Sequence, residues 1–284
     1  MTVESVRSPA AALDPLREEL ERLISPADPE SLWACEQALA RAIAGGAFAD
    51  FANDVISALL TDPKSAPPPT SPLIRQSAFR LAIVSIDQAL ITKHGEEIPA
   101  HAQHMLLANL GPGPCELRLY EREHLDAVEV FDASVRLVDR GERRLLRGEI
   151  MRVRAGAELF HIAKVEAPTV FVVLFGPTVY ETVTVYGNDL TAQRQYAAKL
   201  STTRAQTALT LLNELSAHVD DELTGAVVSM LAHPAHVVRW AAANALSRVS
   251  DGWREFALDR LRHDPHPHVR NAVRRSLEDE ARGA

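Results

Sequence analysis

The sequence predicts an α+β protein with an N-terminal helical unit, a central antiparallel β-barrel and a C-terminal α-solenoid. Three observations predict this fold class. Helix-start signals recur in the first hundred residues, apolar and polar side chains begin to alternate near residue 105, and a segment of the tail is repeated. We expect the three parts to cover residues 1–104, 105–190 and 191–284.

Two Asp-Pro pairs mark helix starts in the N-terminal unit. Asp14-Pro15 and Asp28-Pro29 each place a side-chain acceptor beside a proline, which is tolerated in the first turn of a helix. Gly45-Gly46 predicts a helix end, and the proline-rich stretch 61–72 predicts a linker because prolines cannot continue a helix. Apolar residues at helical spacing predict a further helix over 73–94.

The central region changes to a two-residue period. CELRLYEREH and EVFDASVRLVDRG alternate as strands do, and VFVVLF is apolar on both faces. In the second of these segments, Glu129 would share a face with four apolar residues, from Phe131 to Leu137. Short strands separated by glycine-containing turns predict an antiparallel barrel.

The tail contains an internal repeat. LAHPAHVVRWAAANAL (231–246) aligns with LRHDPHPHVRNAVRRSL (261–277), and the two share a leading Leu, a proline turn, a Val-Arg pair and a closing Leu. Such repeats bury their apolar stripes on one another in a helical solenoid. The histidines of these segments could chelate a metal, but their place in the equivalent inter-helix turn favours turn roles; they are His233, His236, His263, His266 and His268.

Composition excludes several classes of function. The formal net charge of −8 disfavours broad binding to nucleic acid or to an anionic membrane surface, because both require a basic surface. Cys35 and Cys115 form no C-x-x-C pair, so neither a disulfide framework nor a thiolate zinc site is predicted, and Cys115 is expected to be a buried apolar residue. We expect a cytoplasmic protein without a membrane span, and no phosphate loop or G-x-S-x-G motif indicates nucleotide hydrolysis or esterase chemistry.

Two resemblances follow from these segments. The tail resembles short HEAT repeats through 238–246 and 269–277, which implies stacked helix pairs used for contact with a partner protein. The central block resembles a cupin barrel: REHLDAVE is similar to the first cupin motif, with Arg122 in place of the first histidine, His124 as the second and Glu129 as the carboxylate. GEIMRVRAGAELFH is similar to the second motif, with Arg154 where proline is usual and with His161 displaced by two residues.

The cupin resemblance implies a metal centre. Its ligands would be His124, Glu129 and His161, which would hold Fe(II) or another divalent transition metal with open positions for substrate or dioxygen. Arg122 and Arg154 would bind an anionic group of the substrate. The strand pattern places Glu129 and His161 on inward faces, whereas His124 falls on the outward face unless a bulge intervenes.

Each candidate also has a structural interpretation. Glu129 would form an internal ion pair with Arg122 or Arg136, and His161 would be a hydrogen-bonded core histidine. His101 and His104 are interpreted as residues of a solvated helix face.

Two functions follow as expectations. The first is a cupin-type metal-dependent oxygenase, with Fe(II) as the expected ion, that acts on a small polar or anionic molecule inside the barrel. The alternative is a non-catalytic cupin-like sensor or scaffold that binds a partner protein through its HEAT-like tail. A homodimer is a candidate assembly for either.

Overall fold

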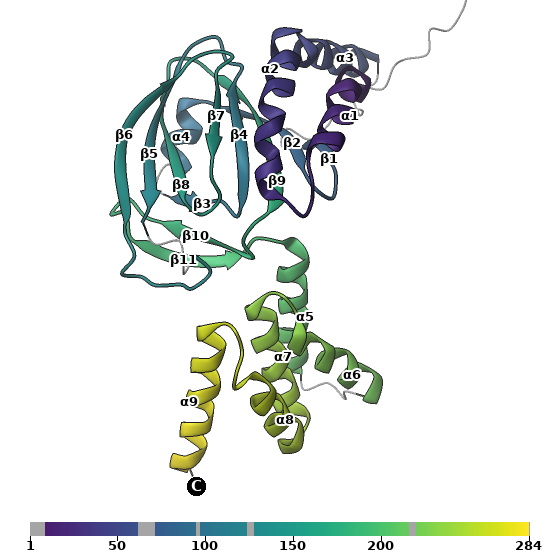
Figure 1. Cartoon of the computed structure of the whole chain (residues 1–284), viewed down its shortest axis with the longest axis vertical. Coiled ribbons are helices and arrows are strands. Elements are labelled where there is room, and N and C mark those ends of the chain that lie inside the picture. Colours follow the sequence, from purple (N-terminus) through teal and green to yellow (C-terminus); the bar gives the residue numbers. More distant parts are fainter. Residues whose placement is uncertain (1–8, 62–71, 95–96, 124–127, 216–219, 284) are drawn as a thin grey trace, which may run out of the picture. The chain divides into compact units, whose positions relative to one another are not determined.

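The computed structural model describes residues 9–61, 72–94, 97–123, 128–215 and 220–283 (Figure 1). Contacts divide the chain into two compact units. The unit that we call the sheet unit comprises Met1–Asp126, Ala133–Tyr180 and Thr184–Arg194. The other, called the helical unit, comprises Ala127–Asp132, Glu181–Val183 and Gln195–Ala284.

The chain begins with helices, as predicted. They are the 3₁₀ segment η1 (Pro9–Leu13), α1 (Asp14–Leu23), the 3₁₀ segment η2 (Pro29–Cys35), α2 (Glu36–Ala44) and α3 (Ala47–Thr61). The side chain of Asp28 accepts a hydrogen bond from the Glu30 amide at 3.1 Å, which confirms the second cap. Gly46 takes a φ of 82°, a conformation that side chains disfavour, where the chain turns between α2 and α3. Most of the predicted linker lies outside the described residues.

The prediction of one helix over 73–94 is wrong. This segment forms strands β1 (Pro72–Arg75) and β2 (Arg80–Ile86), and only α4 (Gln88–His94) is helical. The two faces of β2 contact different apolar cores: Leu81 is fully buried in one, while Ile86 packs at the edge of the other. A run that is apolar on both faces fits a helical period as well as a strand period, so spacing alone could not decide.

Antiparallel sheets form the centre of the sheet unit, which confirms the mixed α+β class. The remaining strands are β3 (Ile98–Ala100), β4 (Gln103–Asn109), β5 (Cys115–Arg122), β6 (Leu137–Leu145), β7 (Ile150–Val153), β8 (Glu158–Val165), β9 (Thr169–Thr178), β10 (Thr182–Tyr186) and β11 (Ala192–Ala197). A five-stranded sheet has the order β1-β2-β9-β4-β7, and two three-stranded sheets have the orders β11-β10-β3 and β6-β5-β8. The register of β9 is antiparallel to both β2 and β4.

The five-stranded sheet separates two cores. On β4, Leu106 and Ala108 pack with the N-terminal helices, which lie along this sheet in Figure 1. Met105 and Leu107 face the other way and pack with residues of β5, β6 and β8, so two sheets meet face to face. Cys115 is fully buried in this second core, as predicted, and burial raises the pKa of its thiol to about 12.

The predicted strand across Glu129 to Leu137 is wrong in its first part. Residues 128–130 form a turn and bend, residues 131–135 are irregular, and β6 begins only at Leu137. Glu129 is therefore not part of a strand. The alternation of residue types around it does not predict which way its side chain points.

One of the expected glycine-containing turns, DRGE at residues 139–142, is instead a bulge inside β6. Leu119 pairs with Gly141 but Tyr120 pairs with Asp139, so one residue of β6 is extra. Gly141 has a φ of 87°, and its amide donates to Oδ1 of Asp139 at 2.8 Å. Beyond this irregularity the buried residues of β5 change phase to Tyr120 and Arg122.

The helical unit packs its helices around one apolar core. Its helices are α5 (Leu200–Leu215), α6 (Asp221–Ser229), the 3₁₀ segment η4 (Met230–Ala232), α7 (His236–Val249), α8 (Asp251–Leu261) and α9 (Pro267–Gly283). Val238 and Val269, the valines of the two repeated Val-Arg pairs, are at most 1% exposed in one shared core. Each repeat therefore contributes the first turns of a helix, as the alignment predicts. The boundaries expected at residues 104 and 190 stay predictions.

No single helix of the described ranges has the length and apolarity needed to span a membrane. The helices Pro29–Ala44 and Ala47–Leu60 reach that length and apolarity only as a pair, which is bent by 57°.

Candidate metal centre

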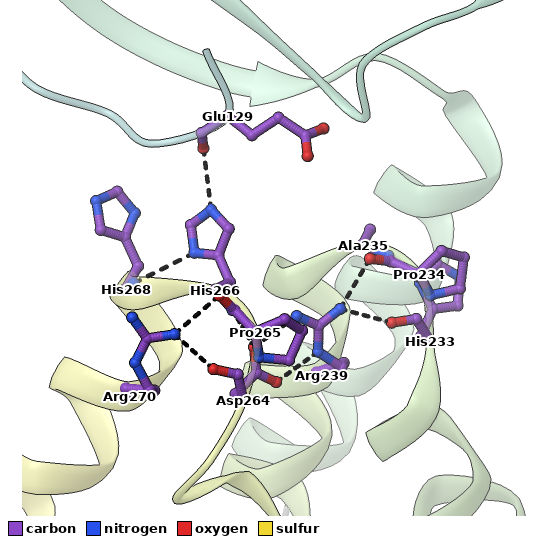
Figure 2. A network of polar contacts seen from close by, with 10 residues as sticks. All are labelled: Glu129, His233, Pro234, Ala235, Arg239, Asp264, Pro265, His266, His268 and Arg270. Atoms are coloured by element: carbon purple, nitrogen blue, oxygen red, sulfur yellow. Dashed lines mark hydrogen bonds and ion pairs between the residues drawn. The ribbon is translucent and has the colours of Figure 1, made fainter. Parts of the chain in front are cut away.

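The two repeats close their turns with the same contacts. Nη1 of Arg239 donates to the carbonyl oxygens five and six residues before it, both at 2.8 Å. Nη1 of Arg270 makes the equivalent bonds at 2.8 and 2.6 Å (Figure 2). The arginine of each Val-Arg pair thus satisfies carbonyl groups of the turn before its helix, which explains why the pair recurs in the sequence.

A buried ion pair joins the repeats. The Asp264 carboxylate accepts hydrogen bonds from Nε of Arg239 at 2.7 Å and from its Nη2 at 2.6 Å. The side chains of Asp264 and Arg239 are 2% and 9% exposed. Oδ1 of Asp264 also accepts the His266 amide at 2.7 Å. Burial alone would raise the pKa of Asp264, but the hydrogen bonds from Arg239 and His266 hold it below its ordinary value. The turn before α9 is therefore anchored to the start of α7.

Three histidines gather beside this anchor. His236 is the first residue of α7, His266 lies in the turn before α9, and His268 lies in the first turn of α9. One ligand atom from each lies within 4.8 Å of the others. His236 and His266 are buried, with exposed fractions of 7% and 9%. We call these three residues the histidine triad; in the described part of the chain it is the one group of three or more potential ligands this close together.

His266 is held by hydrogen bonds at both ring nitrogens. Nδ1 accepts from the His268 amide at 3.2 Å, and Nε2 lies 3.1 Å from the carbonyl oxygen of Glu129 (Figure 2). A carbonyl oxygen only accepts, so these contacts assign the ring proton to Nε2. The ring orientation and the tautomer are therefore both set by backbone groups.

Two members of the triad are in the protonation state that a metal requires. Burial and the neighbouring His266 and His268 together lower the pKa of His236 to about 4, because they disfavour its positively charged form. Burial also lowers the pKa of His266. Both imidazoles are neutral at pH 7, and neutral imidazole is the form that ligates transition metals.

The rings must move before they share an ion. His236 and His266 are stacked, with centroids 3.5 Å apart and planes parallel to within 1°. A metal lies close to the plane of each imidazole that binds it, and two parallel planes have no point in common. Because His266 is fixed by two hydrogen bonds, His236 is the ring expected to turn.

Of the predicted ligands, His124 lies outside the described residues. Glu129 belongs to the helical unit, and its carboxylate accepts a hydrogen bond from the Glu181 amide. In Figure 2 this carboxylate points away from His266, whereas the backbone carbonyl points toward it. Glu129 therefore contacts the triad through its main chain.

His161 lies on β8 opposite Arg118, which is exposed. The register shifts at Ala163, so Ile162 and Phe160 turn to the core while His161 takes the other face. Burial, with Arg118 adding to it, lowers the pKa of His161. The strand parity expected for His161 is wrong because of this irregularity. The ligand set His124, Glu129 and His161 itself stays a prediction.

The two predicted substrate-binding arginines have different surroundings. Arg122 ends β5 at 3% exposure. Burial raises the pKa of Tyr186, and the positive charge of Arg122 offsets part of that rise. Arg154 is exposed in the turn between β7 and β8, where its amide donates to Oε2 of Glu158 at 2.8 Å. Their role in binding a substrate stays a prediction.

His101 and His104 do not lie on a helix, so that interpretation is wrong. His104 is a buried residue of β4 whose Nδ1 accepts the Ala155 amide at 2.9 Å. His101 lies between β3 and β4 with its ring 6.2 Å from that of Phe160. Both support the structure of the sheet unit.

The stability of the sheet unit should depend on pH through His101. Burial, with Arg80 adding to it, lowers the pKa of this side chain to about 4, whereas an unfolded histidine titrates near 6.5. The unfolded state therefore binds the proton first, and the contribution of His101 to stability is lost as pH falls from about 6.5 toward 4. Urea unfolding at pH 7.5 and 5 should show a smaller loss in His101→Gln than in the original protein. An equal loss in both would contradict this.

The triad was visible in the sequence as HPAH and HDPHPH, but its interpretation as turn residues missed the convergence. Aligning the repeats on their Val-Arg pairs supplies the signal. His233 then matches Asp264, and each accepts the amide two residues later, at 3.0 and 2.7 Å. His236 and His268 have no histidine or aspartate counterpart in this alignment. They lie at the starts of α7 and α9, and their rings contact the ring of His266.

Comparisons with known proteins give structural neighbours only. No family model matches the chain, and no curated protein matches it. Among solved structures, vicilin from Solanum lycopersicum is 15% identical with a TM-score of 0.25. The match covers 39% of this chain and 26% of the vicilin chain. Hydroquinone 1,2-dioxygenase from Sphingomonas sp. TTNP3, with 4-hydroxybenzoate bound, is 15% identical with a TM-score of 0.27, covering 40% and 70%.

A third neighbour is a cupin-superfamily sugar phosphate isomerase from Silicibacter pomeroyi. It is 18% identical with a TM-score of 0.24, and the match covers 40% of this chain and 58% of that one. The matched part of this chain spans about a quarter of the tomato vicilin.

Proposed function

We propose that this protein binds one divalent transition metal ion through His236, His266 and His268, and that the ion ties the two helical repeats together. The observation that carries this proposal is the approach of three ligand atoms, one from each histidine, to within 4.8 Å. Imidazole ligands suit zinc, copper and nickel, and three of them leave a position open for water or another ligand. Zn²⁺ is the ion that we propose for the test.

Distances support the proposal once one ring turns. In a tetrahedral zinc site, nitrogen ligands at about 2.05 Å from the ion lie roughly 3.4 Å apart. The ligand atoms must therefore approach one another by up to about 1.4 Å, which a side-chain rotation supplies. The charge of Arg239 is neutralised by Asp264, so this buried guanidinium does not repel the ion.

Metal titration with matched variants tests this function. We expect isothermal titration with Zn²⁺ to give one site per chain, and His236→Gln and His268→Gln each to weaken binding at least tenfold. His263→Gln is the control, because His263 is exposed in the same turn and is not a member of the triad. Equal binding by all four proteins, or the absence of a site in the original protein, would contradict the proposal.

The cupin-type Fe(II) oxygenase suggested by the sequence makes a different prediction. Iron would then copurify with the protein, and Glu129→Gln together with His161→Ala would remove it while His236→Gln would not. An anionic substrate held by Arg122 and Arg154 belongs to that same proposal.

A groove in the tail favours a second candidate function, that of a HEAT-like scaffold which binds an acidic amphipathic helix. The groove has a volume of about 530 Å³ and is lined by Arg262, Arg270 and Arg274, with Val273 and Leu277 as apolar residues. Glu278 is the one acid in this lining. Three guanidinium groups around an apolar surface complement a helix that carries glutamates beside leucines.

Peptide binding tests the scaffold function. A designed Glu/Leu amphipathic helix should bind, and a Lys/Leu helix of the same pattern should not. Reversing two charges in Arg262→Glu/Arg274→Glu should reduce the affinity at least tenfold and should favour the basic peptide. Binding that is unchanged by the reversal would exclude this groove.

A further inference from the structure

We infer that the backbone carbonyl of Glu129 is a positioning group for the metal centre, and that it fixes His266 to ligate through Nδ1. This inference rests on the proposed metal function and names the segment that controls it. The sequence predicts Glu129 as a carboxylate ligand. In the structure its main-chain carbonyl contacts His266, and its carboxylate acts as a clamp that holds the segment by accepting the Glu181 amide.

The tautomer of His266 carries the first step. Its Nε2 proton is donated to the Glu129 carbonyl at 3.1 Å, so the lone pair of the ring lies on Nδ1. A histidine that binds a metal commonly donates its other ring N–H to a carbonyl or carboxylate, which fixes the ring and raises the basicity of the ligating nitrogen. The bond to Glu129 is of this kind and is already made before an ion arrives.

The Nδ1 side also faces the other ligands. Nδ1 accepts the His268 amide at 3.2 Å, and the rings of His266 and His268 lie with centroids 5.0 Å apart and planes at 68°. An ion at Nδ1 replaces this amide, which belongs to the first turn of α9 and is freed to water. Ligation through Nε2 would instead cost the Glu129 bond and would leave Nδ1–H facing an N–H donor.

The position of the Glu129 carbonyl is itself held by side chains. The Glu129 carboxylate accepts the Glu181 amide, and Nε2 of Gln195 donates to the Val128 carbonyl at 3.2 Å. Both contacts lie within the helical unit. The segment 128–132 has no strand or helix of its own, so these contacts and the bond to His266 help to orient the carbonyl. Loosening the carboxylate clamp should therefore misplace His266.

Glutamate 129 offers a matched pair of variants. Glu129→Gln keeps a side-chain oxygen that accepts the Glu181 amide, whereas Glu129→Ala removes the clamp; neither changes a triad residue. We expect Glu129→Ala to weaken Zn²⁺ binding about 10- to 100-fold, the range typical for loss of an outer-shell partner. We expect Glu129→Gln to bind within about threefold of the original protein.

The outcomes separate the two proposals. If both variants bind Zn²⁺ as the original protein does, the carbonyl has no positioning role while the metal function stands. If both lose affinity equally, the carboxylate acts directly on the ion and the inference is wrong.

Hydrogen exchange supplies the reciprocal readout: Zn²⁺ should slow exchange of the Glu181 amide in the original protein and in Glu129→Gln, but not in Glu129→Ala. If the original protein binds no Zn²⁺, the proposed function itself fails.

Discussion

Replacing Asp264 by alanine should destabilise the helical unit by about 3–5 kcal/mol, because it leaves the charge of Arg239 buried without its partner. The Arg239 side chain is 9% exposed, and the carboxylate supplies two of its hydrogen bonds. The same substitution removes the acceptor for the His266 amide. Urea unfolding followed by helical circular dichroism, with hydrogen exchange in α7 and α9, measures the loss.

The control for Asp264 lies on the same helices. Arg274 and Glu278 form an exposed ion pair at 3.7 Å, and Glu278→Ala should change stability by less than about 1 kcal/mol. Replacing both members of the buried pair, in Arg239→Met/Asp264→Leu, should recover part of the loss: no charge is then left uncompensated, but the two turn carbonyls lose their Arg239 donor. A cost for Asp264→Ala as small as that for Glu278→Ala would show that the pair does not join the repeats.

Truncating Leu106 to alanine should destabilise the sheet unit by about 2–5 kcal/mol, the range for a large-to-small change in a packed core. Leu106 is fully buried on β4, where β9 and β7 lie on either side and the N-terminal helices cover its face. Leu60→Ala is the matched control, because Leu60 is 83% exposed on α3 and its loss should stay within about 0.5 kcal/mol.

Hydrogen exchange can show whether Leu106→Ala destabilises the sheet unit alone. Hydrogen exchange should accelerate in β4 and β9 and should be unchanged in α7 and α9. Equal acceleration in both units, or a loss no larger than that of Leu60→Ala, would contradict the assignment of this side chain to the core of the sheet unit.

Much of the secondary structure could be predicted where a signal was local. The Asp28 cap, the two-sided apolar strand β9 and the first turns of α7 and α9 all depend on residues close in sequence. The segment 73–94 was mispredicted because its apolar residues satisfy two periods. The pairing of β2 with β9, which lies about ninety residues later, decides between them.

The candidate site was harder to predict because distant groups determine it. The segment around Glu129 alternates like a strand, yet its position is set by Glu181, Gln195 and His266, which come 52, 67 and 137 residues away. The register shift at Ala163 reversed the face of His161. The repeat alignment did place the tail histidines in one turn, but the stacking of His236 on His266 depends on how two helices pack.

The central claim is that three imidazoles share one metal ion, and X-ray absorption of the protein loaded with one equivalent of Zn²⁺ tests it most directly. The account predicts three imidazole nitrogens at about 2.0–2.1 Å, with one further ligand such as a water oxygen. It also predicts that this set of three imidazole ligands is lost in His236→Gln and is retained in His263→Gln. A first shell made of carboxylate oxygens, or a spectrum that is identical in both variants, would contradict it.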